Sequence, residues 1–171
     1  MTRERAEHGL APVYDENSRI LILGSFPSVA SRAEGFFYGH PRNRFWRVLS
    51  AVLGECVPST VEEKKRLLLG HGIALFDVLA ACEIEGSSDS SITGEIPNDL
   101  TPILASGRIE RIFVNGKTAA RLYDKYLKQK TGLPATVLPS TSPANAAWNL
   151  EKLADAWKII KDNTNAVIID T

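Results

Sequence analysis

The sequence predicts an α/β fold: a single-domain, three-layer αβα sandwich with a central, mostly parallel four-stranded sheet. Short apolar runs alternate along the chain with amphipathic helical patterns, as in proteins built around a parallel sheet. The length of 171 residues suits one domain with a substantial core. Apolar residues make up 44% and charged residues 23%, an ordinary globular composition. We therefore expect residues 1–171 to form one domain, with residues 1–16 as a peripheral N-terminal segment.

Four segments in the first half of the chain have a clear pattern. Residues 20–23 form an apolar run that ends in glycine, which is typical of a buried strand. Residues 43–54 place their large apolar side chains on one helical face and stop at a glycine. Residues 59–70 open with a capping Ser or Thr and carry two glutamates in the first turn, which predicts a second helix. Residues 72–80 predict a second buried strand.

The second half of the chain continues this alternation. Residues 82–99 form an unusually long polar stretch rich in Ser and Gly, which predicts a loop, and long loops in compact domains are usually functional or mobile. The elements that follow are a helical turn at 100–107, a strand at 108–116, a helix at 117–132, a strand at 134–140 and a long helix at 143–162.

Composition argues against several functions. Twenty basic residues balance twenty acidic ones, so no global positive field indicates an extended DNA-wrapping surface, although a small footprint remains open. Cys56 and Cys82 lack a metal-ligand spacing, and we expect neither a metal nor a cofactor. No apolar run approaches the roughly 20 residues that span a bilayer, and the charged first twelve residues do not resemble a signal peptide. We expect a cytoplasmic protein with no membrane partner.

Polar residues, Gly or Pro follow each of the four predicted strands. Ligands of parallel α/β sheets bind outside the carboxyl ends of the strands. The four segments there are 24–28, the residues from Asp77 onward, 115–117 and 139–145. Their common placement predicts a single site.

Two of the motifs near this site allow more than one interpretation. The stretch GSFPS, residues 24–28, is either a plain turn or a backbone cradle whose N–H groups face an oxygen. The stretch GFFYGHPRNRFW, residues 35–46, either lines a cleft with aromatic rings or is a loop held down by them. Within it, His40 suits a structural hydrogen bond, and Asn43 is by itself a good helix cap.

The stretch LPSTSPAN, residues 138–145, places three hydroxyls before a predicted helix. Hydroxyls and free N–H groups at such a position suit phosphate oxygens, and helix capping explains only one of the three. Lys117, at the start of another predicted helix, adds a positive charge to the same rim or is simply a solvated lysine.

These segments, in this order, resemble the uracil-DNA glycosylase superfamily and specifically its hypoxanthine-DNA (DNA-deoxyinosine) glycosylase branch. The resemblance rests on GSFPS, FFYGHPRNRFW, GIALFDVLAACEIEGSSDSSI, FVNGKTA and LPSTSPAN, which span Gly24 to Asn145. GHPRNRFW also resembles the mismatch-specific uracil/thymine enzymes. The resemblance implies a monofunctional DNA repair glycosylase that flips a deaminated base, hypoxanthine first of all, and hydrolyses its N-glycosidic bond.

Two departures from the family pattern bear on the chemistry. Many uracil-removing relatives carry an Asp or Asn that orients the attacking water, and the matching position is Phe26. They often begin the last motif with His or Asn, and here Leu138 stands there. The resemblance to the hypoxanthine branch implies instead that Asn43 supplies the catalytic amide. We expect its carbonyl to accept a hydrogen bond from the attacking water and its amide nitrogen to donate one, although it is a weak base.

The resemblance also implies the remaining contacts. Asp77 stands where uracil enzymes place an Asn that reads the base edge. A carboxylate accepts the N1–H of hypoxanthine but repels the bare N1 of adenine, although Asp77 could also be a structural carboxylate for the loop. The implied base-binding residues are Gly24, Ser25, Phe26, Tyr38 and Asp77, with Tyr38 stacking on the base. The implied phosphate-binding residues are Ser28, Lys117, Ser140, Thr141, Ser142 and Asn145.

The expected partner is DNA that contains a deaminated base, bound by a monomer. Three alternatives remain open: a mismatch-specific uracil/thymine glycosylase of the same fold, a catalytically silent DNA-binding relative, and an unrelated α/β protein that binds nucleotide phosphates.

Overall fold

The protein is built around a four-stranded parallel sheet. Its structure, a computed structural model, describes residues 3–106 and 108–164. The strands are β2 (Ile20–Gly24), β3 (Ile73–Asp77), β6 (Arg111–Asn115) and β7 (Ala135–Leu138), in the order β3-β2-β6-β7. Every residue of β2 and β3 is buried, as strands covered on both faces require. The four strands and their parallel pairing are confirmed.

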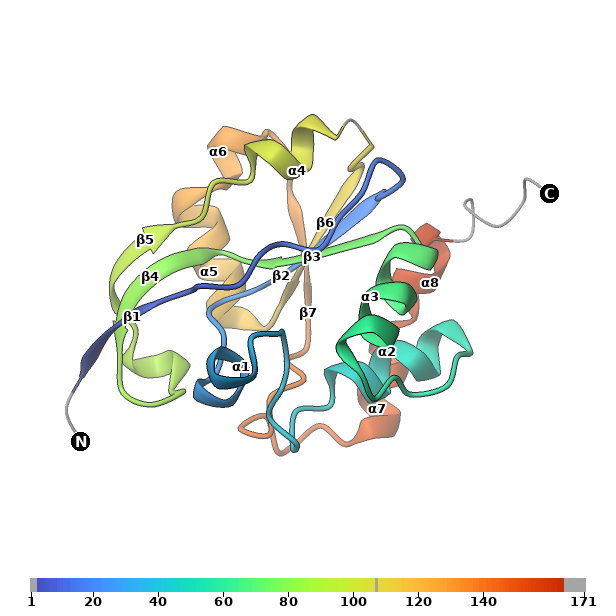
Figure 1. The fold of residues 1–171 in the computed structure, drawn as a ribbon, viewed down its shortest axis with the longest axis horizontal. Coiled ribbons are helices and arrows are strands. Elements are labelled where there is room, and N and C mark those ends of the chain that lie inside the picture. Colours follow the sequence, from blue (N-terminus) through green and yellow to red (C-terminus); the bar gives the residue numbers. More distant parts are fainter. Residues whose placement is uncertain (1–2, 107, 165–171) are drawn as a thin grey trace.

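Helices cover one face of this sheet, on the right of Figure 1. They are α2 (Phe45–Leu53), α3 (Val61–Gly70), α7 (Leu150–Ala156) and α8 (Lys158–Thr164). Helix α2 ends at Gly54 in the left-handed conformation, with φ of 70°. Helix α3 begins with a capping box between Thr60 and Glu63. The predicted end of the first helix and the predicted start of the second are therefore confirmed.

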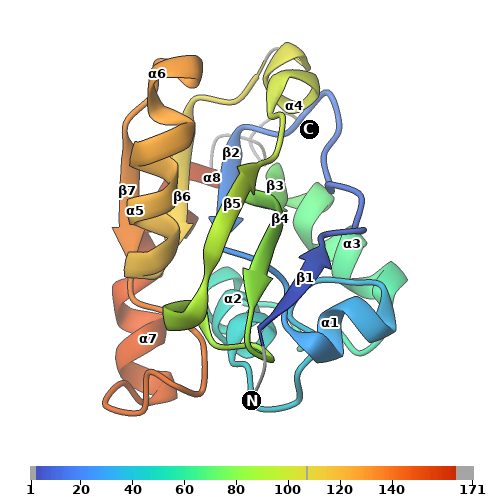
Figure 2. The ribbon, with the colours of Figure 1, turned by 90° about the vertical axis from the view of Figure 1, so that its left-hand side faces the viewer.

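The other face carries helices and a second, antiparallel sheet, which lie in front in Figure 2. The helices are α5 (Lys117–Tyr126) and α6 (Lys128–Thr131), and the second sheet contains β1 (Glu4–Glu7), β4 (Leu79–Ile84) and β5 (Thr93–Pro97) in the order β1-β4-β5. The prediction of one loop over 82–99 was therefore wrong in part. Strands occupy both of its ends, and a 3₁₀ turn at Asp89–Ser91 lies in the connection.

The N-terminal segment contributes to the core. Strand β1 pairs with β4, and Val13 forms an isolated bridge with Leu75 of β3. His8, Leu10 and Val13 are buried. The segment that we expected to be peripheral thus carries a paired strand and several buried side chains, whereas residues 3–5, 7, 9, 11 and 16 are exposed.

The long helix predicted over 143–162 begins only at Leu150. Asn149 caps it by accepting from the backbone N–H of Lys152, and the helix breaks at Trp157 before α8. Residues 143–149 form turns instead, because the guanidinium of Arg44 binds the carbonyls of Ser142, Asn145 and Trp148. Two short helices, α1 (Val29–Glu34) and α4 (Thr101–Ala105), complete the described part of the chain. Within that part, no helix has the length and apolar character to cross a membrane.

Candidate active site

The segments at the carboxyl ends of the parallel strands line one cleft of about 970 Å³. Each residue that we predicted to bind base or phosphate lies on its wall, as does Asn43. From the first and second motifs these are Gly24, Ser25, Phe26, Ser28, Tyr38 and Asn43; from the later ones they are Asp77, Lys117, Ser140, Thr141, Ser142 and Asn145. The predicted convergence of four loop tips is therefore present.

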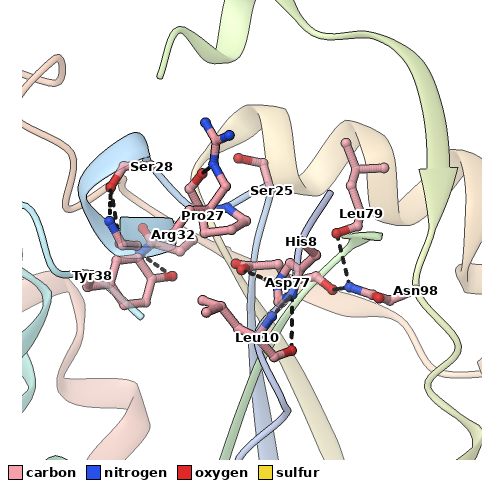
Figure 3. Close-up of polar contacts among 12 residues, drawn as sticks. His8, Leu10, Ser25, Pro27, Ser28, Arg32, Tyr38, Asp77, Leu79 and Asn98 are labelled. Carbon is pink, nitrogen blue, oxygen red and sulfur yellow. Dashed lines mark hydrogen bonds and ion pairs between the residues drawn. The ribbon is translucent and has the colours of Figure 1, made fainter. Parts of the chain in front are cut away.

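The cleft wall leaves no room for a side chain at Gly24. A Cβ atom at this position would lie 2.4 Å from Oδ1 of Asp77 and 2.8 Å from the hydroxyl of Tyr38. The carboxylate and the phenol thus converge on one point above the end of β2, and only glycine leaves room for both (Figure 3). A donor and an acceptor lie side by side there, as recognition of a base edge requires.

The carboxylate of Asp77 is bound to a buried histidine. Its Oδ2 lies 2.8 Å from Nε2 of His8, and the two side chains are each 4% exposed. The backbone carbonyl of Asp77 accepts from the amide of Asn98 at 2.9 Å. Oδ1 has no hydrogen-bond donor among the described residues, so it is the oxygen available to a ligand in the cleft.

Tyr38 combines a strained backbone with a fixed ring. Its φ is 53°, which is uncommon for a residue other than glycine. One face of the ring stacks on Phe45, with ring centroids 4.0 Å apart and an angle of 12° between the planes. Burial, and then the nearby Asp77 carboxylate, raise the pKa of the Tyr38 hydroxyl far above its ordinary value, although a hydrogen bond from Asn115 opposes the shift. Tyr38 is therefore a protonated donor that can offer only one ring face to a base.

Asn43 belongs to a partly buried amide–hydroxyl network. Its Oδ1 accepts from the backbone N–H of Phe45 at 2.9 Å and from Oγ1 of Thr141 at 2.8 Å. Thr141 in turn accepts from Nδ2 of Asn115 at 3.0 Å. The Asn43 amide oxygen is thus occupied, contrary to our expectation that it accepts from a water. The amide nitrogen has no acceptor among the described residues and remains free.

The last motif divides into a structural and an accessible part. Thr141 is fully buried and donates its hydroxyl proton to Asn43, so it has no proton to offer a phosphate oxygen. Ser140 and Ser142 lie on the cleft wall, where each hydroxyl accepts from a backbone N–H two residues later. The Asn145 amide donates to the Ser140 carbonyl at 3.0 Å. Ser140 and Ser142 thus keep their hydroxyl protons free.

Two further predicted phosphate contacts differ in character. Ser28 caps helix α1 by accepting from the backbone N–H of Ser31, which is sufficient reason for a serine there. Lys117 is exposed at the start of α5 and lies on the cleft wall. Lys117 is therefore the stronger candidate of the two for an electrostatic contact with DNA.

Sequence reasoning missed His8 altogether, and it gave Asp89 and Asn115 no individual role within the segments predicted at the site. Asp89 lies on the cleft wall, is exposed to solvent, and accepts from Oγ of Ser25 at 2.9 Å. Desolvation raises the pKa of Asp89, the Ser25 hydrogen bond lowers it, and the charge of Asp77 raises it further. Asn115 ends β6 at the predicted site, and that position was the available signal. The sequence around His8 contains no such signal, because a single histidine in a charged segment forms no recognisable helix or strand pattern.

The fold and the cleft define an α/β protein with one polar site at the carboxyl ends of a parallel sheet. The sequence model of the uracil DNA glycosylase superfamily matches residues 11–162. The chain belongs to this superfamily, which confirms the resemblance seen in the motifs. Among the described residues, no three His, Cys, Asp or Glu side chains are grouped to hold a metal ion.

Named relatives and a solved structure agree with this assignment. The chain is 36% identical over 156 residues to a hypoxanthine DNA glycosylase of Methanosarcina acetivorans, covering 90% of this chain and 97% of that protein. It is 35% identical over 141 residues to a hypoxanthine DNA glycosylase of Methanosarcina barkeri, covering 81% and 88%. A solution NMR structure of a Methanosarcina acetivorans protein superposes with a TM-score of 0.76 at 33% identity, covering 92% and 99%. The DNA glycosylase class predicted from the motifs is thereby supported.

Proposed function

We propose that the protein is a monofunctional DNA glycosylase that removes hypoxanthine from deoxyinosine in DNA after flipping the base. The names of two relatives that match most of the chain support this substrate. The observation that carries the proposal is Oδ1 of Asp77, which lies beside Gly24 on the cleft wall and has no hydrogen-bond donor among the described residues.

Asp77 would select the deaminated base over its parent. Hypoxanthine presents N1–H, which a carboxylate oxygen accepts, whereas adenine presents a bare N1 that leaves both acceptors unpaired. A buried mismatch of this kind costs about 1–3 kcal/mol, or roughly 5- to 150-fold in selectivity. The Tyr38 hydroxyl, which stays protonated, adds a donor beside this carboxylate and suits a purine carbonyl.

Hydrolysis breaks the bond between C1′ of the sugar and N9 of the base. The electron pair leaves with the base, a water oxygen bonds to C1′, the water loses a proton to solvent and the base gains one. The occupied oxygen of Asn43 makes it a poor base, so its free amide nitrogen would hold the water in place. Most of the rate would then come from stabilisation of the departing base within the cleft.

The rim would hold the DNA backbone on either side of the flipped base. The Ser140 and Ser142 hydroxyls can donate to phosphate oxygens, and Lys117 supplies a positive charge. Lys117 is also the one lysine on the cleft wall among the described residues, and it is exposed at the rim. We therefore expect no Schiff base and no strand nicking. We also infer that the protein acts as a monomer in the cytoplasm, which light scattering and cell fractionation would test.

The test uses labelled duplexes that carry inosine, uracil or a G·T mismatch, cleaved at abasic sites by alkali after incubation. We expect strong release from inosine, and an Asn43→Ala variant that loses most cleavage but binds DNA like the parent. Asn17→Ala makes the same change at an exposed residue outside the cleft and should cleave normally. Cleavage of uracil without inosine would favour the mismatch enzyme instead. Inactivity on every lesion with retained affinity for abasic DNA would favour a silent binder.

A further inference from the structure

His8 takes no part in the chemistry above, yet it is buried against the residue proposed to read the base. The residue is 5% exposed and Asp77 is 3% exposed. Sixty-nine positions separate the two in the sequence. Strand β1 brings them together by pairing with β4, and the backbone N–H of His8 continues that pairing with the carbonyl of Ala80 at 2.8 Å. His8 is thus an inward-facing residue at the end of a structured strand.

The contacts around His8 differ at its two ring nitrogens. Nδ1 lies 3.1 Å from both the backbone nitrogen and the carbonyl oxygen of Leu10, so it can accept from the first or donate to the second. Nε2 faces Oδ2 of Asp77 at 2.8 Å, and because a carboxylate oxygen can only accept, Nε2 is the nitrogen that donates there (Figure 3). An N–H donor directed at Oδ2 leaves Oδ1 as the oxygen that faces the cleft.

The surroundings of His8 prevent the ring from finding another partner. Three phenylalanine rings pack around the imidazole: Phe76 at 5.0 Å, Phe37 at 5.8 Å and Phe26 at 6.1 Å between centroids. All three rings are themselves buried. The imidazole is surrounded by apolar rings and has polar contacts only at its two nitrogens, with Leu10 and with Asp77. These contacts fix the ring plane and therefore the direction of its Nε2–H bond.

We propose that His8 is a positioning residue for base selection: its Nε2–H fixes the Asp77 carboxylate so that Oδ1, and only Oδ1, meets the edge of the flipped base. This inference rests on the proposed function, because it assigns Asp77 to the base edge. Without the donor, the carboxylate can rotate and leave a buried oxygen unpaired. Selectivity for hypoxanthine over adenine then falls by about tenfold or more.

Two substitutions separate positioning from packing. His8→Phe adds a fourth ring to an aromatic enclosure and removes the N–H donor. His8→Gln keeps an N–H donor at a similar reach. His71→Phe is the matched control, because His71 pairs with Glu55 outside the cleft. Single-turnover cleavage of otherwise identical inosine and adenine duplexes is measured for each variant, together with thermal unfolding.

We expect His8→Phe to reduce the inosine-to-adenine ratio at least about tenfold, His8→Gln to restore most of it, and His71→Phe to leave it unchanged. A merely structural histidine would lower both rates and the melting temperature together at a constant ratio, and that result would overturn the proposal.

A second measurement does not depend on activity. NMR of the wild-type protein with ¹⁵N-labelled histidine reports the tautomer of His8, and the Asp77 side-chain carboxyl ¹³C shift reports its environment. We expect a proton on Nε2 of His8 and an Asp77 signal that moves in His8→Phe but not in His71→Phe. An Nδ1–H tautomer or an unmoved Asp77 signal would overturn the positioning role. A wild-type protein that spares inosine yet shows the expected signals would contradict the proposed function instead.

Discussion

Gly24→Ala tests the convergence of Asp77 and Tyr38 most directly. The added methyl group would lie 2.4 Å from the Asp77 carboxylate oxygen and 2.8 Å from the Tyr38 hydroxyl, both far inside van der Waals contact. Neither atom can move away easily. Asp77 is bound to His8 at 2.8 Å, and the Tyr38 ring is stacked on Phe45 at 4.0 Å between centroids. The backbone of Gly24 has no positive φ, so the effect is steric rather than conformational.

The size of the effect follows from overpacking. Forcing an extra methyl group into a packed site costs about 1–3 kcal/mol. For a domain of this length, that lowers the melting temperature by roughly 2–12 °C. A displacement of the carboxylate by about 1 Å would reduce inosine cleavage by on the order of a hundredfold. Thermal unfolding and single-turnover cleavage of an inosine duplex measure the two effects on the same preparation.

Gly70→Ala provides the control. Gly70 ends helix α3 with no positive φ, and a Cβ there would meet nothing within 4 Å. The same chemical change should leave cleavage untouched and leave stability equal or slightly higher. If Gly24→Ala melts and cleaves like Gly70→Ala, the two groups do not converge on this point, and the assignment of the base slot fails.

Three further predictions concern the cleft. Asp77→Asn should shift preference from inosine toward uracil, since an amide offers uracil both a donor and an acceptor; an unaltered base profile in the duplex assay would count against its reading role. Asp89→Asn should raise the melting temperature near pH 7 but not near pH 3. The pKa of Asp89 is raised above its ordinary value of 3.8 in the folded protein, so its ionised form, which dominates near pH 7, lowers the stability of the fold. Equal gains at both pH values would refute that cause. Lys117→Gln should lower the slope of log affinity against log salt by about one, and an unchanged slope in a fluorescence titration would remove Lys117 from the phosphate contacts.

The sequence predicted the central sheet and its site because the signals there are strong. Strands β2 and β3 are unbroken apolar runs, and the polar residues that follow them stand where parallel sheets bind ligands. The second sheet was missed because its strands are short and lack a clear alternation. In β5, Gly94 and Pro97 indicated a loop, although both are tolerated in an edge strand.

Long-range contacts decided the remaining differences. Residues 143–149 have the composition of a helix, but their carbonyls are bound by Arg44, about one hundred positions away. The use of His8 likewise depends on a partner 69 positions distant. The Asn43 oxygen is occupied because it accepts from the hydroxyl of Thr141, a residue that the sequence had led us to assign to phosphate binding. Each of these contacts is invisible to local pattern and follows only from the folded topology.

Arg44 joins two parts of the protein that the motifs present as separate. Its guanidinium donates to three carbonyls of the 142–148 turn, its backbone N–H donates to the Thr141 carbonyl at 3.1 Å, and it directly follows Asn43 in the chain. These hydrogen bonds therefore set the position of the 142–148 turn, which would bind the sugar–phosphate strand, relative to Asn43, whose amide would hold the water. A duplex bound out of register on that turn would place its target sugar away from Asn43. Hydrolysis would therefore require that the strand first bind the turn in the correct register.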